Sequence, residues 1–292
     1  MITSQTSSNY GGASQEAIQH HYDVGNDFYR LWLDETLTYS CALWDGDADD
    51  LGRAQRRKLS YLADGALARG AGRVLEVGCG WGGLLRHLVN EYDVQYAVGL
   101  TLSTAQADAL RGQSDPRIEV RVENWAEHEA EGYDAIISIG AFEHFAQFGL
   151  DRSDRLASYR EFFRRCHRWL PARGRLAVQT NIKGNNVRVS RETVRELLFI
   201  VEKIFPESEI PALADVVTSS ERLFDVVSVR NDPDHYARTC AAWHRNLVAN
   251  RDEAVRLVGE STVADYEYYL SSTVGHFERR HLGLARVVFE KV

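Results

Sequence analysis

A run of glycines after a short apolar segment is the part of the sequence best suited to hold a ligand. Gly78, Gly80 and Gly82 alternate in the segment VLEVGCGWGG, and Gly83 follows directly. Because glycine has no Cβ, such a turn lets backbone amides approach a ligand closely. The spacing also satisfies GxGxxG, the dinucleotide-binding pattern. The glycines alone therefore favour a nicotinamide cofactor and S-adenosylmethionine equally.

The end of the next apolar run helps to separate these two cofactors. A nicotinamide site usually has an acidic residue about 20 residues after the glycines, which binds the ribose hydroxyls. Here the run ends with Thr101 and Leu102, and Gln106 follows one helical turn later, so the usual acid is missing. Hydroxyls and an amide can still bind ribose or carboxylate groups. Further on, Asn124 precedes Trp125, whose indole could lie against an adenine.

Short apolar runs alternate with helical patterns through the middle of the chain. We expect strands at 73–77 and 95–101, and in the segments IEVRVEN, YDAIISIG and GRLAVQT. Strands that alternate with helices are typical of a parallel sheet covered on both faces. The segments FDVVSVR and ARVVFEK would complete it. The sequence thus predicts an α/β fold with a doubly wound, mostly parallel, Rossmann-like sheet.

The rest of the chain is arranged around this sheet. Residues 1–14 are rich in Ser, Gly, Asn and Thr and are expected to be flexible, and 15–292 are expected to form one domain. That domain has four expected parts: an N-terminal helical cap (15–70), a cofactor-binding core (71–183), a helical insertion forming a lid (184–220), and the end of the sheet with the C-terminal helices (221–292).

Composition limits the classes of function. The 34 Lys and Arg against 42 Asp and Glu give a net charge of −8, which argues against non-specific nucleic-acid binding. No apolar run approaches the roughly 18 residues that span a bilayer, so at most peripheral membrane contact is expected. The four cysteines are scattered with no CxxC pair, and no secretory signal opens the chain. We expect a reduced, cytoplasmic compartment and no metal site, since the adjacent His20 and His21 would point to different faces of a helix.

Six segments together resemble one known family. They are HYDVGNDFYRLWLDETLTYSCALW (21–44), VLEVGCGWGGL (74–84), VGLTLSTAQ (98–106), SIGAFEHF (138–145), IFPESEIP (204–211) and HYARTCAAWHRN (235–246). The chain resembles the cyclopropane fatty acid synthase and mycolic acid cyclopropane synthase family of S-adenosylmethionine-dependent methyltransferases. The TYSC and FEH segments are specific, because generic methyltransferases lack them. The resemblance implies the class I methyltransferase fold.

The resemblance also implies a set of cofactor-binding residues. The glycines would line the methionine end, Thr101 and Gln106 would meet the ribose, and Trp125 the adenine. The matching positions are Tyr39, Ser40, Glu76, Gly78, Gly80, Gly82, Thr101, Leu102, Gln106, Asn124, Trp125 and Ile139.

In that family a cysteine, a glutamate, a histidine and a tyrosine hold bicarbonate near the transferred methyl. The matching residues here are Cys41, Glu143 and Tyr236, but the histidine position is Gln179. An amide can hydrogen-bond an anion, although it cannot titrate near neutral pH as imidazole does. The sequence leaves open whether bicarbonate binds in the usual way and whether the product is a ring.

The implied chemistry places demands on the pocket. Methyl transfer to an alkene leaves a carbocation, which water would quench, so aromatic walls are expected. Tyr22 and Tyr39 are expected at the site, whereas Phe28 and Trp32 fit core packing better. The cation must then lose a proton, and Glu143 could hold an anionic base or act as the base if burial raises its pKa.

The sequence therefore predicts a methyltransferase that acts on an alkene carbon of an unsaturated acyl or polyketide-like chain, free or bound to a carrier protein. The product would be a cyclopropane or a methyl branch. A small-molecule C- or N-methyltransferase is the alternative, favoured by Gln179 and the polar segment GNNVRVSRETVRE. A cofactor-binding module without turnover is a third reading, opposed by Cys41, Glu143 and Tyr236.

Two basic clusters stand out in this acidic chain. One holds Arg53, Arg56, Arg57 and Lys58, and the other holds Arg164, Arg165 and Arg168. Such clusters are typical of solvated helix faces. A docking patch for an acidic carrier protein is the other interpretation.

Overall fold

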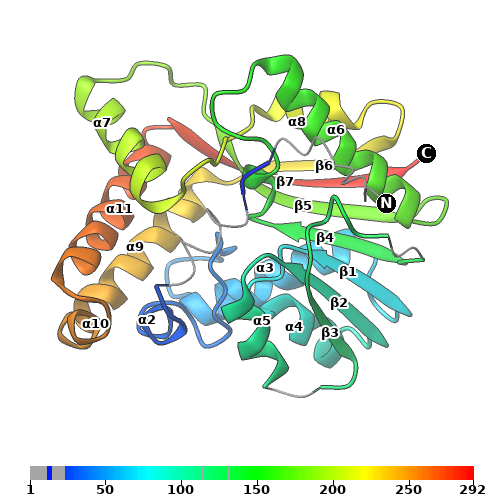
Figure 1. Ribbon diagram of the computed structural model, residues 1–292, viewed down its shortest axis with the longest axis horizontal. Helices are drawn as coiled ribbons and strands as arrows, with labels where there is room; N and C mark the ends of the chain where they lie inside the picture. Colours follow the sequence, from blue (N-terminus) through cyan, green and yellow to red (C-terminus); the bar gives the residue numbers. More distant parts are fainter. Residues whose placement is uncertain (1–11, 15–23, 113–114, 130–131) are drawn as a thin grey trace, which may run out of the picture.

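In the computed structural model, residues 12–14, 24–112, 115–129 and 132–292 are described. They contain a seven-stranded sheet in the order β3-β2-β1-β4-β5-β7-β6 (Figure 1). The first five of these strands are parallel, and β7 runs antiparallel between β5 and β6. The strands are β1 (Arg73–Val77), β2 (Tyr96–Thr101), β3 (Ile118–Val122), β4 (Ala135–Ile139), β5 (Arg175–Lys183), β6 (Phe224–Asn231) and β7 (Leu282–Lys291). The predicted doubly wound, mostly parallel sheet is confirmed.

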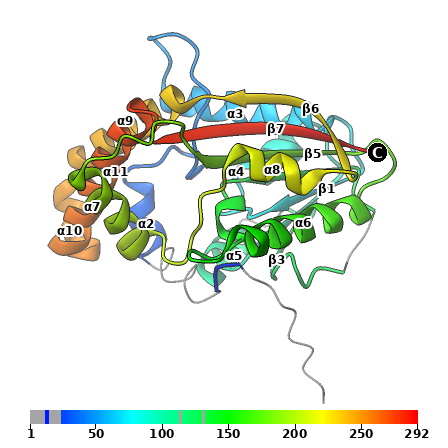
Figure 2. The same ribbon diagram turned by 90° about the horizontal axis from the view of Figure 1, so that it is seen from above.

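Helices cover both faces of this sheet, as Figure 2 shows from above. Because side chains alternate along a strand, Val74 and Leu75 of β1 enter different cores. Val74 packs with α3 (Leu51–Gly65) and α4 (Gly83–Glu91), and Leu75 packs with α6 (Arg152–Trp169) and α8 (Leu213–Ser220). This alternation buries both faces, as a parallel sheet requires.

Several helices begin at side-chain caps that the sequence provides. Asp50 accepts the backbone N–H of Arg53 at the start of α3, and Ser103 accepts that of Gln106 at the start of α5 (Thr104–Arg111). Such caps satisfy N–H groups that have no partner inside the helix. Helix α4 begins differently, because its N-cap Gly82 has a left-handed φ of 72°. The glycine loop therefore turns directly into a helix.

A second cluster lies at one end of the sheet, on the left in Figure 1. It joins α2 (Asn26–Arg30) to α9 (Pro233–Ala249), α10 (Arg251–Val258) and α11 (Glu260–Glu278). Helix α7 (Arg191–Phe199) and the π-helix η2 (Ile200–Ile204) pack against α11. The core of this cluster is unusually aromatic, with Trp32 and Trp243 fully buried in it. It faces the carboxyl ends of the parallel strands.

Two expectations about the flanking segments need correction. Helix α8 was expected in the lid, but it packs beside α6 and buries Val216 in the sheet core. Of the helices in the expected lid, only α7 and η2 stand apart from the sheet. Ala13 falls in the segment expected to be flexible, yet it is buried and its N–H donates to the carbonyl of His144 at 2.9 Å. The remainder of that segment, 1–11, lies outside the described residues.

No helix in the described ranges is long and apolar enough to cross a membrane. All four cysteines are free and buried. Within the same ranges, no three His, Cys, Asp or Glu side chains gather in a way that could hold a metal ion.

Gly99 on β2 allows the sheet to approach the glycine loop closely. A Cβ there would lie 2.7 Å from Leu85 Cδ1 and 2.8 Å from Cys79 Sγ, which is shorter than real contacts. We expect Gly99→Val to lower the free energy of unfolding by roughly 1–3 kcal/mol, the usual cost of overpacking. Urea denaturation measures this. Gly112→Ala is the control, because its φ is −64° and its Cβ would meet only ordinary contacts. Equal midpoints for the two variants would contradict the prediction.

Candidate functional site

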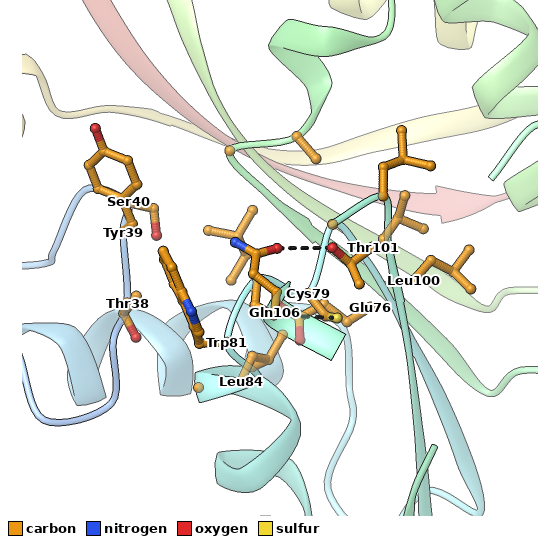
Figure 3. A pocket seen from close by; sticks show the side chains of 18 of the residues that line it. Thr38, Tyr39, Ser40, Glu76, Cys79, Trp81, Leu84, Leu100, Thr101 and Gln106 are labelled. Carbon is orange, nitrogen blue, oxygen red and sulfur yellow. Dashed lines mark hydrogen bonds between the residues drawn. The ribbon is translucent and has the colours of Figure 1, made fainter. Parts of the chain in front are cut away.

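The carboxyl ends of β1, β2 and β4 open onto a pocket with about 940 Å³ of empty space when the solvent at its mouth is included. This edge of an open α/β sheet is where such folds bind ligands. Figure 3 shows part of its lining. The lining includes these predicted cofactor-binding residues: Tyr39, Ser40, Glu76, Gly78, Gly80, Thr101, Leu102, Gln106, Asn124, Trp125 and Ile139. The structure thus brings together positions that are up to 100 residues apart in the chain.

The three alternate glycines have different roles in the geometry. Gly78 has a φ of 83°, and a Cβ there would lie 2.4 Å from that of Ala141, so it allows the loop after β4 to approach. Gly80 lines the pocket, and a Cβ there would meet no protein atom within 4 Å. Gly82 is not among the lining residues; a Cβ there would lie 2.3 Å from Leu110 Cδ2. Gly82 therefore shapes the loop against α5.

Thr101 and Gln106 form a fixed pair on one side of the pocket (Figure 3). The Thr101 hydroxyl donates to Gln106 Oε1 at 2.9 Å, which orients the amide. Gln106 is buried, and its Nε2 has no hydrogen-bond partner in the described part of the chain. A buried donor without a partner costs free energy unless a ligand satisfies it. The pair can therefore donate to a hydroxyl or carboxylate of a bound molecule.

Trp125 forms an aromatic wall at the adjoining end of β3. Its ring packs 5.1 Å from that of Phe145 and 5.4 Å from that of Phe162, so it is held rigidly. Glu123, which precedes it by two residues, also lines the pocket. Sequence reasoning missed Glu123, although it stands directly after the third strand, where such sites place polar groups.

Residues 38–40 of the TYSC segment (38–41) close the opposite side of the pocket. Gln55 on α3 donates from Nε2 to the carbonyls of Thr38 at 3.1 Å and Ser40 at 2.8 Å. Tyr39 donates its hydroxyl to that of Tyr269 at 3.2 Å. Burial raises the Tyr39 pKa well above its usual value, so the phenol keeps its proton. Helix α3 therefore determines where this segment lies.

Lys58 also lies on α3 and corrects an expectation from the sequence. We expected it on a solvated basic face, but it is fully buried, lines the pocket and donates to Ser40 Oγ at 2.7 Å. Burial is the main cause that lowers its pKa to about 7. The overlooked signal is helical spacing, since Lys58 stands four residues from both Ala54 and Leu62, which are buried on the same face.

Glu76, at the end of β1, is the second buried charge of the pocket. Its carboxylate atom Oε2 has no hydrogen-bond partner among the described residues. Burial raises its pKa to about 8, against a lowering contribution from Lys58. No ion pair joins the two side chains in the described structure. Trp81 and His144 also line the pocket and were not predicted.

Glu143 lies just behind the pocket, in the short 3₁₀ helix η1 (Phe142–His144). Its Oε1 accepts the backbone N–H of Asn181 at 2.6 Å, and Oε2 has no partner among the described residues. Burial raises the pKa of this carboxyl to about 7. Tyr236 on α9 is close enough to interact electrostatically with it, and burial keeps the Tyr236 hydroxyl protonated by raising its pKa.

Cys41 and Gln179 lie near Glu143 and Tyr236, and the four side chains form a buried polar cluster. Gln179 donates from Nε2 to the Cys41 carbonyl at 3.3 Å and accepts from Arg286 Nε at 2.8 Å. Burial raises the Cys41 pKa to about 11, so it is a thiol at neutral pH. Arg286, fully buried and ion-paired with Asp232, was not predicted from the sequence.

The buried polar cluster adjoins the pocket, but none of its four residues lines it. Cys41 follows Ser40 in the chain, Glu143 precedes His144, and Gln179 pairs in register with Ile139. Tyr22, the remaining predicted catalytic residue, lies outside the described residues. The geometry is therefore a ligand pocket with a buried cluster of polar side chains beside it.

Comparisons with known proteins agree with this arrangement. The family model "Mycolic acid cyclopropane synthetase" matches residues 12–287. Cyclopropane mycolic acid synthase 3 of Mycobacterium tuberculosis is 35% identical over 288 residues, covering 94% of this chain and 96% of the relative.

Two solved structures are similar over almost the whole chain. The cyclopropane synthase MmaA2 from Mycobacterium tuberculosis has a TM-score of 0.89 at 30% identity, covering 96% of this chain and 99% of that one. The mycolic acid cyclopropane synthase CmaA1 complexed with SAH and CTAB has a TM-score of 0.87 at 33% identity, with the same coverage. The chain belongs to the mycolic acid cyclopropane synthetase family and is an S-adenosylmethionine-dependent methyltransferase.

Proposed function

We propose that this enzyme transfers a methyl group to an alkene carbon of an unsaturated acyl or polyketide-like chain, giving a cyclopropane or a methyl branch. The observation that carries the proposal is the buried Glu143 carboxyl beside a pocket suited to the methyl donor. The relatives, whose names include cyclopropane mycolic acid synthase, support a lipid acceptor.

The pocket residues fit S-adenosylmethionine. Buried Gln106 Nε2 and Glu76 Oε2 both lack protein partners in the described structure, and Gly80 leaves open space beside them. Trp125 offers a rigid face for a purine. When bound, this molecule supplies an electrophilic methyl group on a sulfonium. The chain's contribution is to hold that methyl against the double bond, and orientation of this kind can provide on the order of 7–11 kcal/mol.

The acceptor side must exclude water and tolerate a carbocation. Of the described aromatic residues expected there, Tyr39 lines the pocket, and its ring packs 5.2 Å from those of Trp32 and Trp243. Phe28 and Trp32 are buried in the aromatic core, in agreement with the packing role expected for them. A ring face near the cation would contribute about 0.5–2 kcal/mol.

The proton that leaves the cation needs an acceptor, and Glu143 is suited to this role. Its raised pKa of about 7 lets it take up a proton at neutral pH, whereas an ordinary carboxylate is a much weaker base. The Asn181 N–H holds one carboxylate oxygen in place and leaves the other without a protein partner. Glu143 therefore acts either directly or through an anion that it helps to hold.

Bicarbonate is the anion we propose. The Tyr236 hydroxyl keeps its proton, because burial raises its pKa, and it can donate that proton in a hydrogen bond to an anion. Gln179 keeps one amide N–H for the same purpose, because its other polar contacts are to Cys41 and Arg286.

The polar segment GNNVRVSRETVRE, which favoured a small-molecule acceptor, forms no part of the pocket wall. Residues 184–196 are mostly exposed, and none of them lines the pocket. Its polarity reflects contact with solvent. The segment therefore does not favour the small-molecule alternative, which is left with Gln179 as its support.

Methyl-deuterated S-adenosylmethionine tests the proposed reaction. We expect free or carrier-bound unsaturated acyl chains to gain the label in mass spectrometry. Ring closure removes one deuteron from the new methyl and leaves two, whereas a methyl-branched alkene keeps all three because the chain loses the proton. Label found only on an amine nitrogen would contradict the proposal.

Glu143→Gln should retain the fold, because the amide oxygen can still accept the Asn181 N–H. Turnover should fall by about 10²–10⁴-fold, the usual contribution of a general base, while affinity for S-adenosylhomocysteine stays within a few-fold. In the unsubstituted enzyme kcat should rise with pH through about 7, since the base must be deprotonated. Glu161→Gln on the surface of α6 is the control. Unchanged turnover in Glu143→Gln would remove Glu143 from this role.

Tyr236→Phe tests the anion. The ring should stay packed 4.6 Å from that of Phe277, so only the hydroxyl is lost. We expect turnover of the unsubstituted enzyme to fall when bicarbonate is removed and to recover when it is restored. The variant should be slow and insensitive to bicarbonate. A variant that responds to bicarbonate as the unsubstituted enzyme does would exclude Tyr236 as an anion donor.

A further inference from the structure

We infer that Lys58 and Glu76 bind the charged amino-acid end of the methyl donor, with the Lys58 ammonium holding its carboxylate and the Glu76 carboxylate holding its ammonium. The inference rests on the proposed use of the pocket by S-adenosylmethionine. It adds a lysine from α3, outside the glycine loop, as a determinant of cofactor specificity.

Lys58 has unused hydrogen-bonding capacity. Its ammonium carries three donors, but within the described residues it donates only to Ser40 Oγ at 2.7 Å. No Asp or Glu of the described chain lies within ion-pair distance of it. A fully buried ammonium with one neutral partner is costly, so its retention at the pocket wall indicates an anionic ligand.

Glu76 supplies the complementary group. It is 3% exposed and lines the same pocket, and its Oε2 is unpartnered among the described residues. Lys58 and Glu76 make no ion pair, although each favours the charged form of the other at longer range, so the pocket offers one basic and one acidic group at separate positions. An α-amino acid terminus carries a carboxylate and an ammonium side by side. The carboxylate can face Lys58, and the ammonium can face Glu76.

The position of the pair suits the amino-acid end. Ser40, the partner of Lys58, lies across the pocket from Thr101 in Figure 3, and Thr101 and Gln106 are suited to the ribose. Among the described residues, Lys58 is the only lysine or arginine that lines the pocket. Arg86, which also interacts with Glu76, instead donates to the backbone carbonyls of Trp81 and Thr36.

Burial supports the same interpretation. It lowers the pKa of Lys58 to about 7 and raises that of Glu76 to about 8, so the pocket by itself disfavours both charges. A bound zwitterion would give each charge a partner of opposite sign. The ligand and the two side chains would then stabilise one another's charged forms.

Isothermal titration calorimetry of the full chain tests this with three ligands. They are S-adenosylhomocysteine, its decarboxylated analogue, and 5′-methylthioadenosine, which lacks the amino-acid end. We expect Lys58→Met to weaken S-adenosylhomocysteine roughly 10- to 100-fold, the range for hydrogen bonds to charged groups. The variant should bind the other two ligands within a few-fold of the unsubstituted protein.

Gln55→Met is the matched control. Gln55 holds the same 38–40 segment from the same helix but does not line the pocket, so its loss should weaken all three ligands alike. If Lys58→Met behaves like Gln55→Met, Lys58 acts only through the shape of the segment and the inference is overturned. It is also overturned if Lys58→Met leaves S-adenosylhomocysteine affinity unchanged. Absence of binding by the unsubstituted protein would instead refute the proposed cofactor.

Discussion

The site depends on a buried cation that lies outside it. Arg286 of β7 is fully buried, donates to Gln179 on β5 and to the Ala42 carbonyl at 3.0 Å, and pairs with Asp232 at the start of α9. An unpaired guanidinium in this position would cost several kcal/mol, so these partners are held together. Through Ala42, the ion pair attaches the TYSC segment to the sheet.

That segment is attached from two directions. Residues 37–44 have no helical or strand hydrogen-bonding pattern of their own, so their carbonyls need other donors. Gln55 of α3 donates hydrogen bonds to the carbonyls of Thr38 and Ser40, which line the pocket. Arg286 of β7 donates to the carbonyl of Ala42. The segment therefore forms one wall of the pocket through Tyr39 and Ser40, and it contributes Cys41 to the buried polar cluster.

The sequence could predict the parts of the site whose roles depend on local patterns. The glycine loop, the pair of Thr101 and Gln106, and Trp125 each follow a strand, and parallel strands must bring their carboxyl ends to one edge. Lys58 could not be recognised in the same way, because its neighbours Arg56 and Arg57 give the impression of a solvated face. The burial of α3 is decided by its packing on the sheet.

The contact between Gln179 and Arg286 was also beyond local patterns. The two residues are 107 positions apart, and the contact depends on β7 inserting antiparallel beside β5. The apolar character of the last strand indicated that it would join the sheet, but it did not determine which strand it would pair with. The position of α8 was missed for a similar reason, since its packing against α6 is a long-range contact.

The contact between Gln179 and Arg286 also helps to indicate which group accepts the proton that the carbocation loses. Gln179 stands where the family resemblance implies an imidazole, and an amide does not titrate near neutral pH. Burial raises the pKa values of the Cys41 thiol and the Tyr236 phenol, so both stay protonated. Glu143, with a pKa of about 7, is then the member of this cluster whose proton equilibrium lies near neutrality. In the proposed reaction, proton removal would then fall to Glu143 or to an anion that Glu143 holds, while the hydrogen bond from Arg286 keeps Gln179 oriented.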